Sequence, residues 1–493
     1  MRNFIKFYVN GSYYQVNCDN AFKPLSQFLR ENLYLTGTKE VCCEGDCGAC
    51  TVLVGKSNGG EILYKPLNSC ILYVYQLDNT HILTIEGIKY SENLNPIQKS
   101  IVKNNGTQCG YCTPGVINTL YSYFNNLSVA ERPEEKQVKK ALTGNLCRCT
   151  GYEGIIRSAL DVKPCDVKEI NMLYPQESLE KILLKKILDE KTETIEISNE
   201  NQKYIKPSSL EEAINEKTKN TQAKILAGGT DIHVLSNKKD IKPEVIIDIS
   251  DLKELKTIDI KNDFINIGAA VTIAESEKVF GHYFAEFYTL LEYYASPQIK
   301  NVATLVGNIA NASPVGDSIP FLMIMDAFVE VIGKNGKREI NINNLYKGYK
   351  TLDLSSDEII TGVKIPLLKQ NETLKLYKVS KRKHLDISTF SAAFKIKLEN
   401  NIIQDFSFVL GGVAAYTIKM KKVEEFIKGK EATEDVFVCA GKIIEEEIVP
   451  LSDVRGSKEY RIDLAKNILK KFYLDIQQNY DQSEAALTDK ELS

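Results

Sequence analysis

The sequence predicts an α+β protein built from several domains, and three observations support this fold class. The chain has 493 residues, which at about 100–200 residues per domain gives about three or four domains. Eleven of the twelve cysteines lie before residue 166, so the first third of the chain has a chemistry of its own. The apolar pattern changes from short alternating runs to helical spacing, and then to both in alternation.

The composition describes a globular chain without a strongly charged character. Hydrophobic residues make up 43%, charged residues make up 26%, and the net charge is −3. This balance gives no reason to expect a nucleic acid or an anionic membrane as a partner. Residues 1–17 lack the apolar core of a signal peptide, and no run of about 18 apolar residues occurs. We therefore expect a cytoplasmic protein, in which structural disulfides are rare.

Residues 1–87 are predicted to form a small β-rich domain, because short apolar runs alternate with turn residues. The expected elements are hairpin strands at 4–9 and 13–16 around Asn10-Gly11, a helix at 24–33, a second hairpin around Gly59-Gly60 and a last strand at 81–87.

Residues 88–165 are predicted to be helical. One helix is marked by apolar side chains at helical spacing, namely Val116, Ile117, Leu120, Tyr121 and Phe124. Thr113 is expected to cap this helix, and Pro114 is expected to be its first helical residue.

The rest of the chain is divided by composition. Residues 166–202 are rich in Lys, Glu and Thr, and we expect a linker with room for one helix. Strand-like and helical segments alternate over 203–373 and again over 374–480, which predicts two α/β units. Residues 481–493 are expected to form a polar tail.

The densest group of cysteines lies in residues 41–50, "VCCEGDCGAC", and has a recognisable spacing. Three of its thiols follow C-x4-C-x2-C, which is the plant-type [2Fe–2S] pattern and needs one more cysteine downstream. The predicted ligands are Cys42, Cys47, Cys50 and Cys70. Cys43 is left out, because it would give C-x3-C-x2-C.

The glycines of this loop are consistent with a cluster. Gly45 and Gly48 allow the tight wrapping that directs backbone N–H groups at the sulfurs. A structural zinc site is the alternative, since four cysteines also bind zinc, although two C-x2-C pairs are its usual form.

A second group of cysteines has the spacings C-x2-C and C-x-C, and its members are Cys109, Cys112, Cys147 and Cys149. Spacing alone leaves a cluster and zinc equally open here. The histidines are scattered and are expected to be structural: His81, His233, His282 and His384.

Three motifs in this order resemble the iron–sulfur half of the molybdenum hydroxylases, the family of xanthine dehydrogenase and aldehyde oxidase. They are "GTKEVCCEGDCGACTV", "QCGYCTPG" and "GNLCRCTGY". The resemblance implies a plant-type ferredoxin domain of β-grasp fold at 1–87. It also implies a helical-bundle domain at 88–165 that holds a second [2Fe–2S] cluster on the second group of cysteines.

The resemblance continues into a two-part FAD-binding domain at 203–373, followed by a C-terminal flavoprotein domain at 374–480. The segments that carry it are "ILAGGTDI", "IGAAVTI" and "NVATLVGNIANASPVGD". No GxGxxG motif follows an early strand, so a Rossmann site is not expected. The implied FAD contacts are Ile225, Leu226, Ala227, Gly228, Gly229, Thr230, Asp231, Ile232, Tyr294, Thr304, Asn308, Asp317 and Ile360.

Four positions depart from the family pattern. Val41 and Cys43 replace glycines near the first cluster. Val306 replaces a glycine of the flavin loop, and Thr389 stands where close relatives have a flavin-contacting Lys.

The resemblance implies an electron-transfer subunit of a xanthine dehydrogenase-like enzyme. A large partner subunit would hold the molybdenum cofactor, so no residue of this chain is predicted to be catalytic. Electrons would pass through two clusters to FAD and then to NAD+, in a hetero-oligomer such as a dimer of heterodimers. The alternatives are a molybdenum hydroxylase for aldehydes or other N-heterocycles, and a zinc-stabilised binding scaffold without redox activity.

Overall fold

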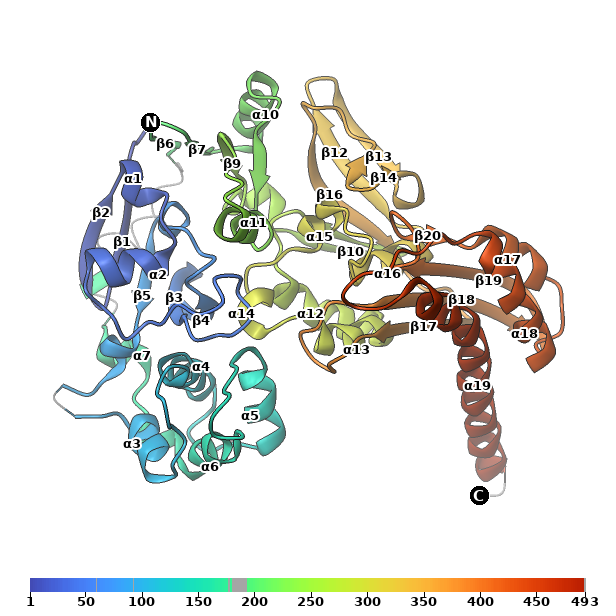
Figure 1. Cartoon of the computed structure of the whole chain (residues 1–493), viewed down its shortest axis with the longest axis horizontal. Coiled ribbons are helices and arrows are strands. Elements are labelled where there is room, and N and C mark those ends of the chain that lie inside the picture. Colours follow the sequence, from blue (N-terminus) through green and yellow to red (C-terminus); the bar gives the residue numbers. More distant parts are fainter. Residues whose placement is uncertain (59, 92, 176–177, 180–192, 492–493) are drawn as a thin grey trace. The chain divides into compact units, whose positions relative to one another are not determined.

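The computed structural model describes the chain except for residues 59, 92, 176–177, 180–192 and 492–493, together with the side chains of Asn58 and of 478–491 (Figure 1). The chain divides into two compact units. Unit 1 comprises 1–255, 272–275 and 295–304, and unit 2 comprises 256–271, 276–294 and 305–493.

A five-stranded sheet of order β2-β1-β5-β3-β4 begins unit 1. Its strands are β1 (Ile5–Val9), β2 (Ser12–Val16), β3 (Thr51–Asn58), β4 (Glu61–Asn68) and β5 (Thr80–Leu83). The first predicted hairpin is confirmed: Val9 pairs with Ser12, and both turn residues, Asn10 and Gly11, have positive φ, as a two-residue type I′ turn requires. Asn58 pairs with Glu61 in the second hairpin. Gly59 of its predicted turn lies outside the described residues.

Short helical segments accompany this sheet. They are α1 (Cys18–Ala21), α2 (Leu25–Gln27), the π-helical η1 (Phe28–Asn32), η2 (Val74–Leu77) and η3 (Ile85–Ile88). The helix predicted at 24–33 is therefore present, but it changes from α to π geometry at Phe28.

The predicted helical domain follows, with a core that includes Leu120, Tyr121 and Phe124. Its elements are α3 (Pro96–Lys103), α4 (Thr113–Asn125), α5 (Glu135–Ala141), η4 (Leu142–Gly144), α6 (Glu153–Asp161), η5 (Pro164–Asp166) and α7 (Ile170–Leu173). The predicted cap of α4 is wrong, because Cys112 occupies the N-cap position and Thr113 is already helical. The Thr113 hydroxyl instead lies 2.7 Å from the Thr107 hydroxyl.

A four-stranded sheet of order β6-β7-β9-β8 completes unit 1. Its elements are β6 (Ile195–Ser198), β7 (Lys203–Lys206), α10 (Leu210–Lys219), β8 (Lys224–Leu226), α11 (Ile232–Lys239), β9 (Val245–Asp248), η6 (Lys253–Leu255) and α14 (Pro297–Lys300). β6 lies inside the segment predicted to be a linker, where it pairs with β7.

The two sheets of unit 1 share one hydrophobic core. Tyr75 of the first sheet's domain stacks on Tyr204 of β7, with ring centroids 4.4 Å apart, and both rings are buried. Leu226 and Ile246 belong to the same apolar cluster as Phe7. The compact units therefore do not divide at residues 166–202.

Unit 2 contains two antiparallel sheets of order β10-β11-β16-β12-β13 and β17-β18-β19-β20, and a two-stranded ribbon β14-β15. The strands are β10 (Ile258–Lys261), β11 (Phe264–Gly268), β12 (Phe328–Gly333), β13 (Gly336–Asn341), β14 (Tyr346–Gly348), β15 (Thr351–Leu352), β16 (Ile359–Pro366), β17 (Glu372–Val379), β18 (Phe390–Glu399), β19 (Ile402–Gly411) and β20 (Ile418–Lys419).

The helical segments of unit 2 end in one long helix. They are α12 (Ile273–Tyr283, which starts in unit 1), α13 (Ala285–Tyr294), α15 (Leu305–Asn311), α16 (Ser318–Ile324), η7 (Ile342–Asn344), α17 (Lys421–Ile427), α18 (Glu434–Ile443), η8 (Ile444–Glu446) and α19 (Lys458–Glu491). α19 continues through the predicted tail at 481–493 as far as Glu491. Its Phe472 stacks on Phe394 of β18 at 4.3 Å, which joins the helix to the sheet core.

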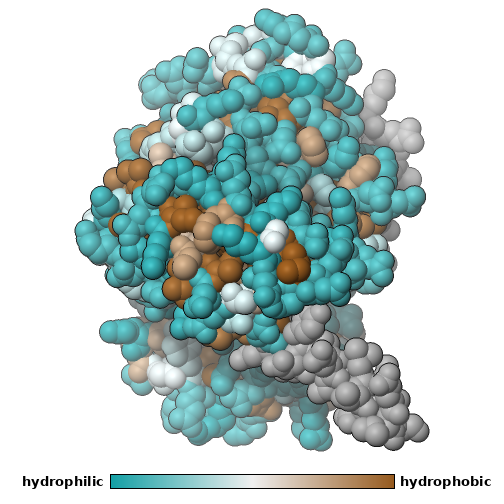
Figure 2. Space-filling model, turned by 90° about the vertical axis from the view of Figure 1, so that its right-hand side faces the viewer, coloured by the Kyte–Doolittle hydropathy of each residue, from teal (hydrophilic) through white to brown (hydrophobic). Residues whose placement is uncertain are grey.

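One face of the molecule, shown in Figure 2, is mainly hydrophilic, with apolar side chains gathered in places. Figure 2 views the side on which α17 and α18 lie in Figure 1. Exposed large apolar residues of this region of the sequence are Val438, Val449, Leu451, Val454 and Leu474. No helix within the described residues is both long enough and apolar enough to cross a membrane.

His81 of β5 is a buried histidine with a fixed tautomer. The backbone N–H of Gly11 donates to Nε2 at 3.1 Å, so Nδ1 carries the proton and faces the Tyr64 hydroxyl at 2.6 Å. Tyr8 and Tyr174 present ring edges to the imidazole. Among the described residues no carboxylate compensates for the loss of water, and burial lowers the pKa of His81 to about 3.

We expect acid to destabilise the fold through His81. Below about pH 6.5, His81 binds a proton in the unfolded chain but not in the folded chain. The free energy of unfolding therefore decreases by up to about 1.4 kcal/mol for each pH unit by which the pH is lowered. Denaturant titrations at about pH 7 and about pH 5 should show a smaller loss in His81→Gln than in the parent. His282→Gln, at an exposed position, is the control; equal losses in all three proteins would contradict the assignment.

Candidate iron–sulfur and flavin sites

The four thiols predicted for the first cluster lie together in unit 1. The Cys42 thiol is within hydrogen-bonding contact of Cys47 and Cys70, and Cys70 also contacts Cys50. Cys50 and Cys70 are buried. Cys42 and Cys47 are partly exposed, and all twelve cysteines of the chain are free thiols.

The surroundings shift the pKa values of these four thiols in opposite directions. Hydrogen bonds from Cys47 and Cys70 lower the pKa of the Cys42 thiol, and the backbone N–H groups of Glu44 and Cys47 add to this effect. A hydrogen bond from Cys70 likewise lowers the pKa of Cys50. Hydrogen bonds to Cys42 raise the pKa values of Cys47 and Cys70. The contacts thus favour the thiolate, the form that binds iron, at Cys42 and Cys50 only.

The loop has the wrapped backbone that the glycines predict. Gly45 and Gly48 have φ values of 78° and 68°. Cys43 has φ of 56°, which costs a non-glycine residue about 1–2 kcal/mol and explains why the family pattern has glycine there. Burial, followed by the charges of neighbouring groups, raises the pKa of the Cys43 thiol, whereas the four predicted ligands exchange hydrogen bonds.

The carbonyl groups of this loop are bonded by donors from outside it. Asn68 Nδ2 donates to the Gly45 carbonyl at 2.6 Å. The backbone N–H of Leu146 donates to the Cys47 carbonyl at 2.9 Å. Leu146 directly precedes Cys147, so one hydrogen bond connects the two predicted cluster sites.

The second group of thiols forms two pairs. Cys149 Sγ lies 3.5 Å from Cys109 Sγ, and Cys112 contacts Cys147. Burial opposes ionisation of Cys147, but hydrogen bonds, chiefly from Thr150, outweigh it and lower the pKa of this thiol. Cys109 and Cys149 are exposed and Cys147 is buried, so the site opens to the surface on one side.

Both groups have the donor composition of a two-iron cluster. Each supplies four thiols in contacting pairs, which is the donor set that two irons need. No group of three or more His, Cys, Asp or Glu side chains in the described part of the chain is arranged to hold a metal ion. The cluster assignment therefore depends on the thiol contacts and on the spacing of the cysteines. The iron and zinc content of the purified protein distinguishes a cluster from the zinc site that the sequence also allows.

The predicted flavin loop at 225–232 connects β8 to α11 in unit 1. Gly228, Gly229 and Thr230 donate no backbone hydrogen bond within the described residues, although Gly229 is buried. Free N–H groups at the start of a helix suit a phosphate group. A Cβ at position 228 would lie 2.0 Å from the Val302 carbonyl oxygen, so only glycine fits at this position of the loop.

The other predicted FAD contacts are divided between the units. Thr304 belongs to unit 1, and the rest belong to unit 2: Tyr294, Asn308, Asp317 and Ile360. Burial raises the pKa of Tyr294. The Asn308 side chain accepts a hydrogen bond from Ser318 at 2.6 Å, and Ile360 lies in β16 opposite Val331.

Asp317 is buried and paired, unlike a solvated loop carboxylate. Lys378 Nζ lies 2.6 Å from its Oδ2, and the Ser388 hydroxyl donates to its Oδ1. Lys378 was not predicted from the sequence, because a lysine in the mixed pattern of a strand gives no sign that it is buried.

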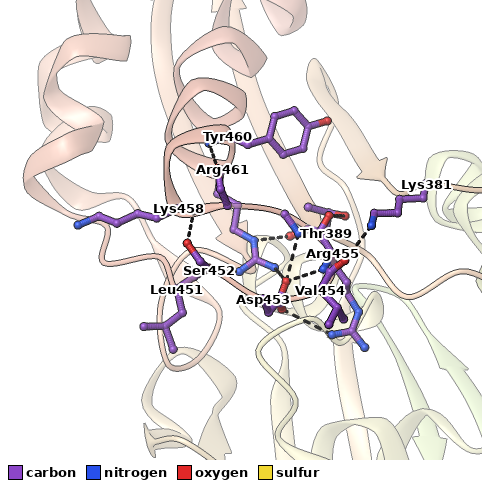
Figure 3. Close-up of polar contacts among 12 residues, drawn as sticks. Lys381, Thr389, Leu451, Ser452, Asp453, Val454, Arg455, Lys458, Tyr460 and Arg461 are labelled. Atoms are coloured by element: carbon purple, nitrogen blue, oxygen red, sulfur yellow. Dashed lines mark hydrogen bonds and ion pairs between the residues drawn. The ribbon is translucent and has the colours of Figure 1, made fainter.

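Thr389 lies within a network around a buried arginine in unit 2 (Figure 3). The Arg461 guanidinium donates to the Thr389 carbonyl at 3.2 Å and to the Asp453 carboxylate at 2.8 Å, and it also donates to the Leu451 carbonyl. These bonds hold the 451–456 loop over Thr389. Arg461 was missed too, since an arginine near the start of a helix is usually exposed.

Gln298 of α14 is a third residue that sequence reasoning missed. It is 1% exposed, and its Nε2 lies near three oxygens: 3.0 Å from Asn145 Oδ1, 3.3 Å from Thr119 Oγ1 and 3.4 Å from Thr51 Oγ1. Gln298 thus joins the flavin part of unit 1 to both cysteine domains.

Three family models match separate parts of the chain. A [2Fe-2S] binding domain matches residues 84–160, and an FAD binding domain in molybdopterin dehydrogenase matches 197–368. A CO dehydrogenase flavoprotein C-terminal domain matches 375–476.

Whole-chain comparisons agree with these matches. The chain is 29% identical to xanthine dehydrogenase of Emericella nidulans over 98% of its length, and 28% identical to aldehyde oxidase 1 of Bos taurus over 96%. It spans 39% of each relative. Among solved structures, a Cu,Mo-CO dehydrogenase has a TM-score of 0.52 and 25% identity, covering 54% of this chain and 94% of that chain. Quinoline 2-oxidoreductase from Pseudomonas putida 86 has a TM-score of 0.52 and 24% identity, covering 56% and 96%.

The paired thiols suit iron–sulfur clusters, and the glycine loop suits the phosphate groups of a flavin nucleotide. On this fold, the two features together define an iron–sulfur flavoprotein. The matches carry the assignment further: the chain belongs to the molybdenum hydroxylase family and carries its [2Fe–2S] and FAD-binding domains.

We expect Cys43 to be dispensable for the first cluster and Cys42 to be essential, because the four-thiol group excludes Cys43. Cys42→Ser should lose about half of the iron and one electron paramagnetic resonance signal. Cys43→Gly should keep both, and relief of the positive φ should raise stability by about 1 kcal/mol. Loss of a signal in Cys43→Gly would overturn the assignment.

We expect Gly228→Ala to lose bound FAD, because its Cβ would collide with the Val302 carbonyl. Flavin absorbance per protein measures the loss, and the resonance signals of both clusters show whether unit 1 is still folded. Gly281→Ala, whose Cβ would meet only ordinary contacts, should retain its flavin. Full flavin content in Gly228→Ala would exclude this loop as the phosphate site.

Proposed function

We propose that this chain is the electron-transfer subunit of a molybdenum hydroxylase that resembles xanthine dehydrogenase. The observation that carries the proposal is the hydrogen bond from Leu146 to the Cys47 carbonyl. It places the backbone of the second, more exposed group of cysteines against the backbone of the first, more buried group. Two one-electron sites in contact, followed by a flavin site, form a relay from the surface to a two-electron acceptor.

The exposed thiol pair marks the entry side of this relay. Gln108, Cys109 and Cys149 are all exposed, and the resemblance places Gln108 and Cys149 next to the molybdopterin. On this basis we propose that a large partner subunit holds the molybdenum cofactor and docks on this exposed side, in a hetero-oligomer such as a dimer of heterodimers.

The proposed roles follow from this arrangement. The cysteines Cys42, Cys47, Cys50 and Cys70 hold one cluster, and Cys109, Cys112, Cys147 and Cys149 hold the other. The glycine loop binds the pyrophosphate of FAD through free backbone N–H groups. FAD, when bound, accepts single electrons and delivers a pair. NAD+ is the proposed final acceptor, and hypoxanthine or xanthine is the proposed substrate of the partner.

A different molybdenum hydroxylase is the second candidate. It is favoured by the breadth of the comparisons, which include an aldehyde oxidase, a CO dehydrogenase and a quinoline oxidoreductase. The substrate is chosen on the partner subunit, so turnover of purines, aldehydes and N-heterocycles by the purified complex separates the candidates. Iron, zinc, molybdenum and flavin analysis of the same preparation tests the relay against a zinc scaffold.

We expect the chain alone to reduce a dye with NADH and to leave hypoxanthine and xanthine unchanged. It carries the flavin-side elements, and hydride exchange between flavin and nicotinamide is reversible, but it supplies no predicted catalytic residue. Dye bleaching and purine consumption by the isolated chain and by the complex measure both parts. Flavin that NADH never reduces would exclude NAD+ as the acceptor, and purine turnover by the chain alone would exclude a separate catalytic subunit.

A further inference from the structure

Helix α11 packs against the segments that carry the first group of thiols. Val234 contacts the small apolar cluster formed by Cys50, Cys70 and Ile71. Lys238 Nζ lies 3.6 Å from the Glu44 carboxylate in the cysteine loop. The same helix begins directly after the glycine loop, so one short helix touches both the cluster segments and the flavin segment of unit 1.

Asn237 of this helix places its amide on two cysteine residues. Its Nδ2 donates to the Cys70 carbonyl at 2.8 Å and to the Cys43 carbonyl at 3.0 Å. Its Oδ1 accepts from the Tyr73 hydroxyl at 3.0 Å. The Tyr73 bond sets which end of the amide faces the cysteines, so the N–H groups are held on the cluster side.

His233, one turn earlier, fixes the position of the helix. Its Nδ1 lies 2.8 Å from the Ile71 carbonyl and is therefore protonated, and its Nε2 accepts from the Tyr75 hydroxyl at 2.8 Å. The ring stacks on Tyr73 at 4.3 Å and is fully buried. A shift of α11 would break these contacts, so the Asn237 amide cannot move away from the cysteines.

The amide has an electrostatic consequence for a cluster held by these cysteines. Reduction adds one negative charge, and nearby hydrogen-bond donors stabilise the charged form. The two N–H groups of Asn237 offset the partial negative charge of two carbonyl oxygens, one on the ligand Cys70 and one on Cys43. The reduced state is thereby favoured.

We propose that Asn237 is a positioning residue that raises the reduction potential of the cluster held by Cys42, Cys47, Cys50 and Cys70. This inference rests on the proposed function, because it requires that cluster. The Asn237 donors lie on α11, the helix that starts directly after the flavin loop. This helix therefore affects the driving force of electron transfer through the cluster.

The test is a redox titration of the full chain, followed by electron paramagnetic resonance. The signal of the first cluster is the one that Cys42→Ser abolishes. Asn237→Asp removes the donors and adds negative charge, and Asn237→Leu only removes the donors. At a fixed applied potential we expect Asn237→Asp to lower the reduced-to-oxidised ratio about tenfold, which is about 59 mV for a one-electron couple. Asn237→Leu should act in the same direction, by less.

Asn220→Asp is the matched control, because this amide in unit 1 donates only to Glu216. Asn220→Asp should leave the reduction potential of the first cluster unchanged. Both Asn237 variants should leave the reduction potential of the second cluster unchanged. Unchanged first-cluster potentials in both Asn237 variants would overturn the proposal. The proposal would also be overturned if both Asn237 variants lost the signal of the first cluster and kept that of the second, because Asn237 would then have a purely structural role. A parent chain without iron would instead refute the proposed function.

Discussion

The structure of unit 1 depends on how the 42–50 loop satisfies its backbone. A loop that turns N–H groups toward thiolates turns its carbonyl groups outward, and buried carbonyls need donors. Those donors come from distant segments: Asn68 for Gly45, Leu146 for Cys47 and Asn237 for Cys43. Each bond satisfies the loop and attaches another part of the chain to it. The geometry of one cysteine loop thus determines which segments of unit 1 must pack together.

This constraint explains why the first third of the chain is not an independent module. The aromatic side chains of Tyr75 and Tyr204 are buried in one core, and buried Gln298 contacts both cysteine domains. Separating the parts would expose apolar surface and leave buried polar atoms without partners, both of which cost free energy. A rigid assembly suits electron transfer, because the redox sites keep fixed neighbours.

The polarity of the surroundings differs between the two thiol groups. The first has two buried thiols beside apolar Ile71, with amide donors behind them. The second has two exposed thiols and a hydroxyl donor on Cys147. Burial, hydrogen bonds and solvent exposure are the factors by which a protein sets cluster potentials. Two chemically similar groups of cysteines therefore have different electrostatic environments within one unit.

Elements whose signals are local could be predicted from the sequence. The spacing of Cys42, Cys47 and Cys50, the Asn10-Gly11 turn and the apolar stripe of α4 all depend on neighbours within a few residues. The cap of α4 was mispredicted and β6 was missed inside the expected linker, because tertiary contacts override weak terminal signals. The roles of Asn237, Gln298 and Arg461 depend on the packing of distant segments. Asn237 meets a cysteine 167 positions away, and Gln298 meets an asparagine 153 positions away. An amide gives no sign in the sequence of which distant carbonyl it will satisfy, because that choice is made when the chain packs.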